Sequence, residues 1–146
     1  MTQFFIFRSF DGNGRRYVSP EDIIAVKADD NNLTQPDEKE QKQGKTAQKA
    51  PAAMVFIDDN GGGPHPVVRY KTKETEQDVK RILGGFFPRF ESLDGRGGYF
   101  INKDRLCGIS VDQNASCAVH LRTSGKAINE PVEEDEKTIL EAINGG

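Results

Sequence analysis

The chain is poor in the residues from which metal sites and disulfide scaffolds are built. It contains two cysteines and two histidines among 146 residues, with no CxxC pair and no HxxxH pair. A zinc site needs at least three well-spaced ligands, and a disulfide scaffold ordinarily uses more cysteines. The sequence therefore predicts no metal, no cofactor and reduced thiols.

Long apolar runs are also absent. No stretch approaches the roughly 18 consecutive apolar residues of a membrane span. The opening MTQFFIFRSF lacks a charged region followed by a full hydrophobic region, as a signal peptide would have. We therefore expect a cytoplasmic protein that does not engage a membrane.

Excess positive charge is missing as well. The chain has 23 acidic and 20 basic residues, a formal net charge of −3. Whole-molecule attraction to phosphate backbones is therefore not favoured, and any contact with nucleic acid would have to be local.

Patterns of known catalytic loops are lacking too. The glycine-rich stretches GNGRR and GRGG are not followed by G-K-[ST], and no G-x-S-x-G elbow occurs. Cys107 and Cys117 stand where the first half of the chain has Ile24 and Ala53, which favours packing over nucleophilic roles. The sequence predicts no catalytic residues, and we expect that the protein is not an enzyme.

What the chain does have is an internal repeat. DGNGRRYVSPEDIIAV, from Asp11, resembles DGRGGYFINKDRLCGI, from Asp94. Two further blocks follow in the same order, AAMVFIDDNG with SCAVHLRTSG and DVKRILGG with ILEAINGG, where Val79 meets Leu140. Three collinear blocks indicate a tandem duplication with halves 1–85 and 86–146.

The first half carries an insertion at about 32–51 that the second half lacks. Residues 31–51 include one leucine, no aromatic residue and many Lys, Gln, Asp and Glu. Such a segment cannot bury enough apolar area to offset the entropy of ordering it. We expect a mobile hairpin loop, most simply a solvated insertion.

Each half has the pattern of short strands followed by one helix. An apolar-aromatic run, a D-G turn and a second short strand predict a hairpin. Ser19-Pro20 and Asn102 are N-cap signals for single helical turns. Two β-branched strands, one more strand and a helix-spaced apolar stripe complete the half. The sequence predicts an α+β fold of two pseudo-symmetric, antiparallel β-rich repeats, each ending in one helix.

Two groups of residues are candidates for ligand binding. Arg15, Arg16 and Arg96 adjoin the glycine-rich turns, where backbone N–H groups and guanidinium groups can hold an anion. Basic side chains and an aromatic ring also cluster at Arg69, Tyr70 and Lys71, a pattern that can bind single-stranded nucleic acid. The simpler interpretation is a pair of hairpin turns and a strand face with solvated charges.

The second half resembles the small flagellar FlbD-like family. The matching motifs are Leu93-Asp94-Gly95, Phe100-Ile101-Asn102, Leu106 with Ile109, Val119-His120-Leu121, Gly125-Lys126 and the acidic helix from Glu133 to Ile143. The resemblance implies a small non-enzymatic domain, and its setting implies a bacterial or phage accessory protein.

These observations favour a non-catalytic binding or adaptor protein that engages a protein partner or a small anionic ligand. The alternative is a single-stranded nucleic-acid-binding protein that uses the arginine-bearing turns and the Tyr70 region. The sequence predicts no particular oligomeric state.

Overall fold

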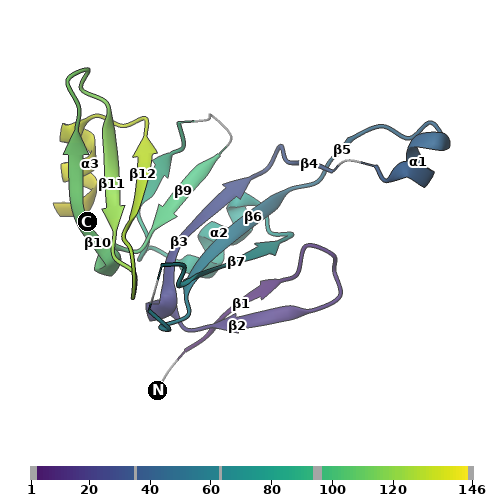
Figure 1. Ribbon diagram of the computed structural model, residues 1–146, viewed down its shortest axis with the longest axis horizontal. Helices are drawn as coiled ribbons and strands as arrows, with labels where there is room; N and C mark the ends of the chain where they lie inside the picture. The colour runs from purple at the N-terminus through teal and green to yellow at the C-terminus, as the bar shows by residue number, and fades with distance from the viewer. Residues whose placement is uncertain (1–2, 35, 63, 94–96, 145–146) are drawn as a thin grey trace.

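The computed structural model of the chain describes residues 3–34, 36–62, 64–93 and 97–144. Within these ranges the chain forms antiparallel strands, three α-helices and two 3-10 helices (Figure 1). The α+β class that the sequence predicts is confirmed. The described helices are all too short or too polar to cross a membrane.

The first half begins with the hairpin that the Asp11-Gly12 turn predicts, formed by β1 (Phe5–Arg8) and β2 (Arg15–Val18). The following elements are η1 (Pro20–Asp22), β3 (Ile23–Asp29), β4 (Leu33–Thr34), α1 (Glu38–Lys42), β5 (Gln48–Lys49), β6 (Ala52–Asp58), β7 (Val67–Thr72) and α2 (Glu76–Leu83). Ser19 and Pro20 open a single turn of 3-10 helix as expected, but the Ser19 side chain makes no capping hydrogen bond.

The second half contains the same succession of elements without β4, α1 and β5. Its elements are β8 (Arg89–Glu91), β9 (Gly98–Ile101), η2 (Lys103–Arg105), β10 (Leu106–Val111), β11 (Cys117–Leu121), β12 (Ile128–Val132) and α3 (Glu136–Asn144). Asn102 caps η2 by accepting a hydrogen bond from the Asp104 N–H at 3.0 Å. Element type and order therefore agree between the halves.

Five strands from both halves form the central sheet, in the order β7-β6-β3-β9-β8. A three-stranded sheet, β10-β11-β12, belongs to the second half alone, and β1-β2 and β4-β5 are two-stranded ribbons. The hairpin β8-β9 thus extends the sheet of the other half, because β9 pairs antiparallel with β3. In Figure 1 the three-stranded sheet stands beside the β8-β9 end of the central sheet.

The expected pseudo-twofold relation between the halves is not confirmed. In a twofold arrangement, the pairing of β3 with β9 would be repeated by β10 with β2. Among the described strands β10 pairs only with β11, and β2 pairs only with β1. The strands of the two halves are also not confined to separate sheets, because the long-range pairing of β9 with β3 merges strands from both halves.

Local details agree closely between the halves all the same. The pairing of β3 with β6 shifts register between Ile23 and Ala25, and the pairing of β10 with β11 shifts between Leu106 and Gly108, the aligned positions. Such a β-bulge bends and twists the strand that carries it. Strands β3 and β10 therefore share the same irregularity at the same point.

Each hairpin is also joined to its own half by matching contacts. The bridge Ser9–Thr72 matches the bridge Ser92–Val132. The backbone bond from Lys73 N–H to Arg8 C=O matches the bond from Glu133 N–H to Glu91 C=O. The Glu74 carboxylate accepts from the Arg8 N–H, and the Glu134 carboxylate accepts from the Glu91 N–H. The two hairpins are therefore attached at equivalent positions of their halves.

The helix caps refine the alignment of the last block. Thr75 caps α2 by accepting from the Asp78 N–H, and Asp135 accepts from the Thr138 N–H at the start of α3. In each helix a fully buried residue lies four positions after the capping residue, so Val79 corresponds to Ile139 and not to Leu140. The predicted pairing of Val79 with Leu140 is therefore wrong by one residue.

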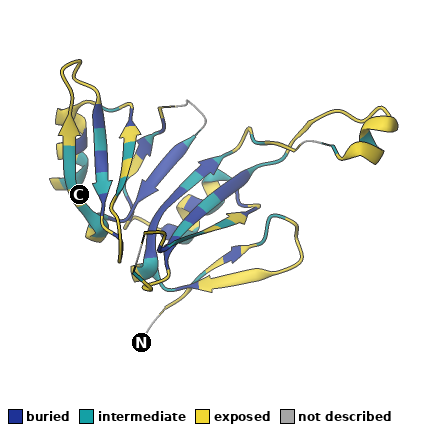
Figure 2. Ribbon diagram, in the orientation of Figure 1, coloured by how far each residue is buried: buried dark blue, intermediate teal, exposed yellow. Residues whose placement is uncertain are grey.

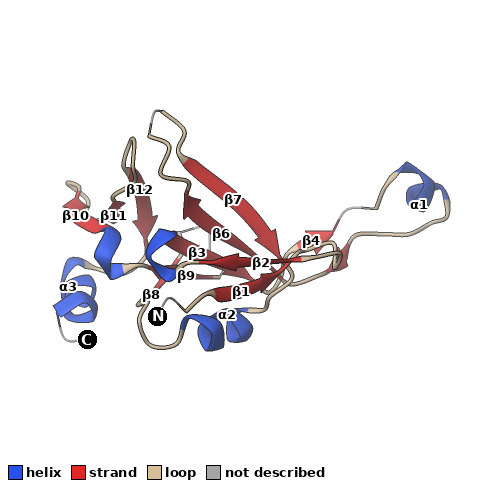
Figure 3. Cartoon of the chain, turned by 90° about the horizontal axis from the view of Figure 1, so that it is seen from below, coloured by secondary structure: helices blue, strands red, loops and turns tan. Residues whose placement is uncertain are grey.

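Two apolar cores lie on opposite faces of β3. The first core contains Val26, Val79 and Leu83 together with Phe87 and Phe100 from the second half. The members of the second core are Ile24, Ala25, Phe90, Tyr99, Ile101, Cys117, Val119, Leu121, Val132 and Ile139. Figure 2 shows β3, β6 and β9 as largely buried strands, and Figure 3 shows α2 beside β1 and α3 beside the three-stranded sheet.

The insertion forms an exposed arm that projects from the end of β3 and β6 (Figure 1). It consists of the ribbon β4-β5 with α1 at its tip, and α1 has no buried residue. The ends of the arm are close, since the Ala50 N–H donates to the Asn32 carbonyl at 2.8 Å. The predicted hairpin is present, and its mobility stays a prediction.

Candidate functional site

A groove lies where the two halves meet near their 3-10 helices. It has a volume of about 1160 Å³ and is lined by Gln3, Phe5, Ser19, Pro20, Glu21, Gly85, Phe86, Phe87, Pro88, Asn102, Lys103, Asp104 and Ala142. Three phenylalanines and two prolines give it an apolar lining, and Phe86 is 77% exposed. Such a concave apolar surface with a few charged groups is typical of a binding site.

The groove takes equivalent residues from both halves, because η1 and η2 both border it. The equivalent pairs are Ser19 with Asn102, Pro20 with Lys103, Glu21 with Asp104, and Phe5 with Pro88. Glu21 and Asp104 contribute negative charge and Lys103 contributes positive charge. The groove can therefore offer an apolar surface together with groups that bind a cation.

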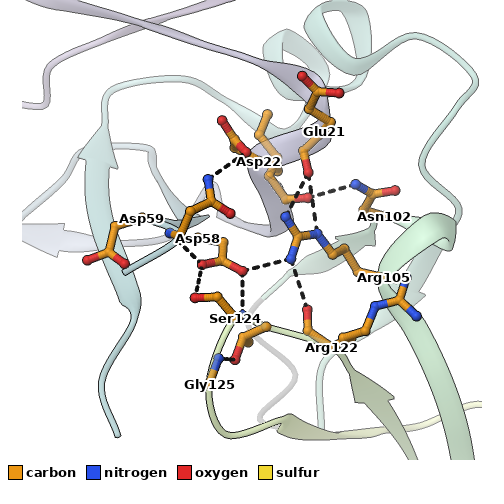
Figure 4. A network of polar contacts seen from close by, with 12 residues as sticks. Glu21, Asp22, Asp58, Asp59, Asn102, Arg105, Arg122, Ser124 and Gly125 are labelled. Atoms are coloured by element: carbon orange, nitrogen blue, oxygen red, sulfur yellow. Dashed lines mark hydrogen bonds and ion pairs between the residues drawn. The ribbon is translucent and has the colours of Figure 1, made fainter. Parts of the chain in front are cut away.

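A polar network next to the groove joins the halves through Asp58, the last residue of β6 (Figure 4). The Asp58 carboxylate accepts from Arg105 Nη1 at 2.7 Å, from Ser124 Oγ at 2.7 Å and from the Ser124 N–H at 2.7 Å. The Asn60 N–H adds a fourth bond at 2.8 Å. One carboxylate of the first half thus holds η2 and the loop after β11 of the second half.

Arg105 and Asn102 extend this network toward the groove. Arg105 Nη2 donates to the Glu21 carbonyl at 2.9 Å, and Asn102 Nδ2 donates to the Ile23 carbonyl at 2.8 Å. Both bonds cross from the second half to the first, and they end on the backbone of η1 and β3. The network therefore fixes the position of the two 3-10 helices that border the groove.

The protonation of Asp58 follows from its partners. Burial opposes the charged form, but the bonds from Ser124, Asn60 and Arg105 outweigh it and hold the pKa of Asp58 below its usual range. Its oxygens are already engaged, and among the described residues no histidine or cysteine takes part in these bonds. The arrangement supports an ion pair that fixes structure and does not support a general base.

The residues predicted from the sequence do not form one cluster. Arg16 stacks over the Tyr70 ring at 5.5 Å, and Lys71 lies over Phe10 at 4.1 Å. Arg69 lies over Phe56 at 5.5 Å, and Arg15 over Tyr17 at 6.0 Å. Arg96 lies outside the described residues. Because neighbouring strand residues point to opposite faces, Arg15 and Arg16 diverge, and so do Arg69 and Tyr70.

The first glycine-rich turn already holds an anion of its own. The Asp11 carboxylate accepts from Ser9 Oγ at 2.7 Å and from the Asn13 N–H at 2.8 Å, and these bonds lower the pKa of Asp11. The turn N–H of Asn13 is therefore occupied by the chain itself. In the part of the chain that the structure describes, no group of three or more His, Cys, Asp or Glu side chains could hold a metal ion.

Sequence reasoning missed the network around Asp58. Its acid and base lie 47 residues apart, and neither belongs to a recognisable motif. The groove was also missed, although Phe86 and Phe87 mark the junction between the halves. A pair of adjacent aromatic residues directly after Gly84-Gly85 was the only available signal.

Comparison with known proteins adds no assignment: no protein-family model, no curated protein and no solved structure matches the chain significantly. The resemblance of the second half to the FlbD-like family stays a prediction.

Proposed function

We propose that the protein is a non-catalytic adaptor that binds a protein partner in the groove between η1 and η2. The observation that carries this proposal is the groove itself, with Phe86 77% exposed among other aromatic and proline side chains. Exposed aromatic residues in a concave surface are common anchors of protein interfaces. The setting of Asp58 supports a non-enzymatic role, because its carboxylate is fully engaged.

The groove also indicates what the partner presents. An apolar side chain can pack on Phe86, and a lysine or arginine can approach Glu21 and Asp104, which border the same groove. The proposed partner segment therefore combines an apolar anchor with a basic residue. We also propose a cytoplasmic location, since Cys107 and Cys117 are free thiols.

Affinity capture with variants tests this proposal. The wild-type protein, Phe86→Ala and Leu33→Ala are immobilised, and proteins retained from the native cell extract are compared. Leu33 is a matched control, because it is 47% exposed but lies on the arm. We expect one partner to be retained by the wild type and Leu33→Ala, and about tenfold less by Phe86→Ala. Equal retention by all three proteins would contradict the proposal.

A second candidate function is the binding of single-stranded nucleic acid or a small anion near β2 and β7. The pair Arg16–Tyr70 favours it, because the Arg16 guanidinium group of β2 lies over the Tyr70 ring of β7. Oligonucleotide titration at two salt concentrations tests it. Binding that weakens steeply with salt and is lost in Arg16→Ala would support this candidate.

A further inference from the structure

Within the described part of the chain, one strand edge in each half has no partner in the other half. β3 lies between β6 and β9, whereas its equivalent β10 is an edge strand of the three-stranded sheet. β9 pairs with β3, whereas its equivalent β2 pairs only with β1 among the described strands. Figure 2 shows β2 as mostly exposed and β10 as partly intermediate and partly exposed, on different sides of the molecule. We call the antiparallel pairing of β9 with β3 the complete joint. The equivalent strand edges, those of β2 and β10, are the two unpaired sides of a second joint.

Side chains that are buried in the complete joint are exposed at the unpaired hairpin. Phe87 and Phe100 reach from the second half into the first core and are 7% and 3% exposed. Their equivalents Phe4 and Tyr17 are 52% and 54% exposed. The β1-β2 hairpin therefore carries the aromatic pair of the joint without a core to receive it.

The opposite side of the joint shows the same difference. Ile23, Val26 and Ala28 on β3 are fully buried at 0% exposure. Their equivalents on β10 are Leu106 and Ile109, which are half-buried, and Val111, which is 43% exposed. β10 therefore presents an apolar strand edge of the kind that β9 covers on β3.

A glycine marks the same joint. In the complete joint, Gly97 has φ +137° and lies so close to β3 that an added Cβ would stand 1.8 Å from the Ala28 carbonyl oxygen. Its equivalent, Gly14, has nothing within 4 Å of such a Cβ and no positive φ. Within a single chain, nothing requires glycine at position 14. If another strand packed on β2 as β3 packs on β9, that strand would require glycine at position 14.

Charges at the two unpaired sides are complementary, with the sign exchanged. In the complete joint Asp58 accepts from Arg105. The equivalent of Asp58 is Arg122, which is exposed, and the equivalent of Arg105 is Asp22, which accepts from Asn60 Nδ2 at 3.1 Å. At the second joint the position of the acid Asp58 is therefore taken by the base Arg122. The position of the base Arg105 is taken by the acid Asp22.

A second ion pair follows the same logic. Arg89 donates to Glu76 at 2.9 Å across the joint, and an added Cβ on Gly98 would lie 2.6 Å from the same carboxylate. The equivalents of Arg89, Gly98 and Glu76 are Ile6, Arg15 and Glu136. In the first half the arginine lies on β2, the equivalent of β9, and not on β1, the equivalent of β8. From β2, Arg15 can reach Glu136 of a second chain if Glu136 is placed as Glu76 is.

We propose that β2 of one chain pairs antiparallel with β10 of a second copy of this chain. The register copies that of β9 on β3: Tyr17 stands opposite Ile109 as Phe100 stands opposite Val26, and Arg16 stands opposite Ser110 as Tyr99 stands opposite Lys27. The pairing forms a second five-stranded sheet, β12-β11-β10-β2-β1, and brings Asp22 to Arg122. Because the contact is head-to-tail, it generates a closed ring or a filament. The inference does not depend on a partner in the groove.

Charge reversal tests the assembly on the full chain. Sedimentation velocity should give masses that are multiples of 16.2 kDa for the wild type, rising with concentration to the ring or filament. Asp22→Arg or Arg122→Asp alone should weaken association about tenfold or more, and the two changes in one chain should restore it. Circular dichroism melting checks that each variant is folded. A wild type that is monomeric up to about 1 mM, or single variants that associate like the wild type, would overturn the proposal.

Disulfide trapping tests the register. In a Cys107→Ser background, Arg16→Cys combined with Ser110→Cys should give covalent dimers and a ladder after mild oxidation, because opposed strand positions have Cα atoms about 4.5–5.5 Å apart. Arg16→Cys combined with Gln113→Cys is the mismatched control and should give little product. Equal products from both pairs, or dimers from Arg16→Cys alone, would overturn the proposal, the latter by indicating β2-β2 contact.

Discussion

At the scale of single residues, two positions hold the halves together, Asp58 and Gly97. Asp58 is a buried carboxylate with four donors, and three of those bonds come from Arg105 and Ser124 in the second half. Gly97 allows the β8-β9 hairpin to approach the backbone of Ala28. One feature is electrostatic and the other is steric, so they can be tested separately.

Replacing Asp58 tests the electrostatic feature. Asp58→Asn leaves Arg105, whose side chain is 15% exposed, without its carboxylate, and should lower the free energy of unfolding by about 3 kcal/mol at pH 7. Urea denaturation measures the change. Asp59→Asn is the matched control, because Asp59 is exposed and should change stability by less than about 0.5 kcal/mol. Equal losses in the two variants would contradict the role of Asp58.

The same carboxylate predicts a pH dependence. The pKa of Asp58 is lower in the folded chain than in the unfolded chain, so the unfolded chain binds the proton more readily and acid favours unfolding. Its stabilising effect is complete above the ordinary aspartate pKa of about 4 and is lost as the pH falls through the lower folded value. The difference between wild type and Asp58→Asn should shrink between pH 5 and pH 2. A difference that is constant over this range would contradict this assignment.

Replacing Gly97 tests the steric feature. Gly97→Ala should lower the free energy of unfolding by about 2 kcal/mol or more, because the methyl group meets backbone atoms at a positive φ. Gly85→Ala is the control, since nothing lies within 4 Å of its added Cβ and its φ is not positive. Chemical denaturation of the two variants compares them. If Gly97→Ala were as stable as Gly85→Ala, β9 would not lie so close to β3.

At the scale of elements, local signals predicted most of the secondary structure. The D-G turn gives the first hairpin, Ser19-Pro20 and Asn102 open the 3-10 turns, and both β-branched hairpins form as expected. Each of these signals acts within a few residues. The pairing of β9 with β3 has no local signal, since it depends on which strand edge the other half leaves open.

The arm of β4, α1 and β5 belongs to this scale and carries its own prediction. Its ends are joined by the Asn32–Ala50 hydrogen bond, and β4, α1 and β5 contain no buried side chain. Replacing residues 33–49 by Asn-Gly should therefore leave the melting temperature within about 3 °C of wild type. Differential scanning calorimetry measures this. A fall of about 10 °C or more would show that the arm packs on the fold.

At the scale of the whole molecule, the two halves share one order of elements and are joined by the pairing of β9 with β3. The repeat predicted the order of elements in each half, because the same patterns occur twice. It could not predict the groove or the Asp58 network, because Phe86, Arg105 and Ser124 acquire their neighbours only when the halves meet. It also could not reveal that, among the described strands, β2 pairs only with β1 and β10 only with β11.

The proposed assembly uses one joint twice, once within the chain at β3 and β9 and once between chains at β10 and β2. Amide hydrogen exchange measured over a range of protein concentrations tests this most directly. We predict that amides of β3 and β9 exchange slowly at every concentration, whereas exchange in 15–18 and 106–111 slows as concentration rises. Exchange in β2 and β10 that is fast and independent of concentration would contradict the claim.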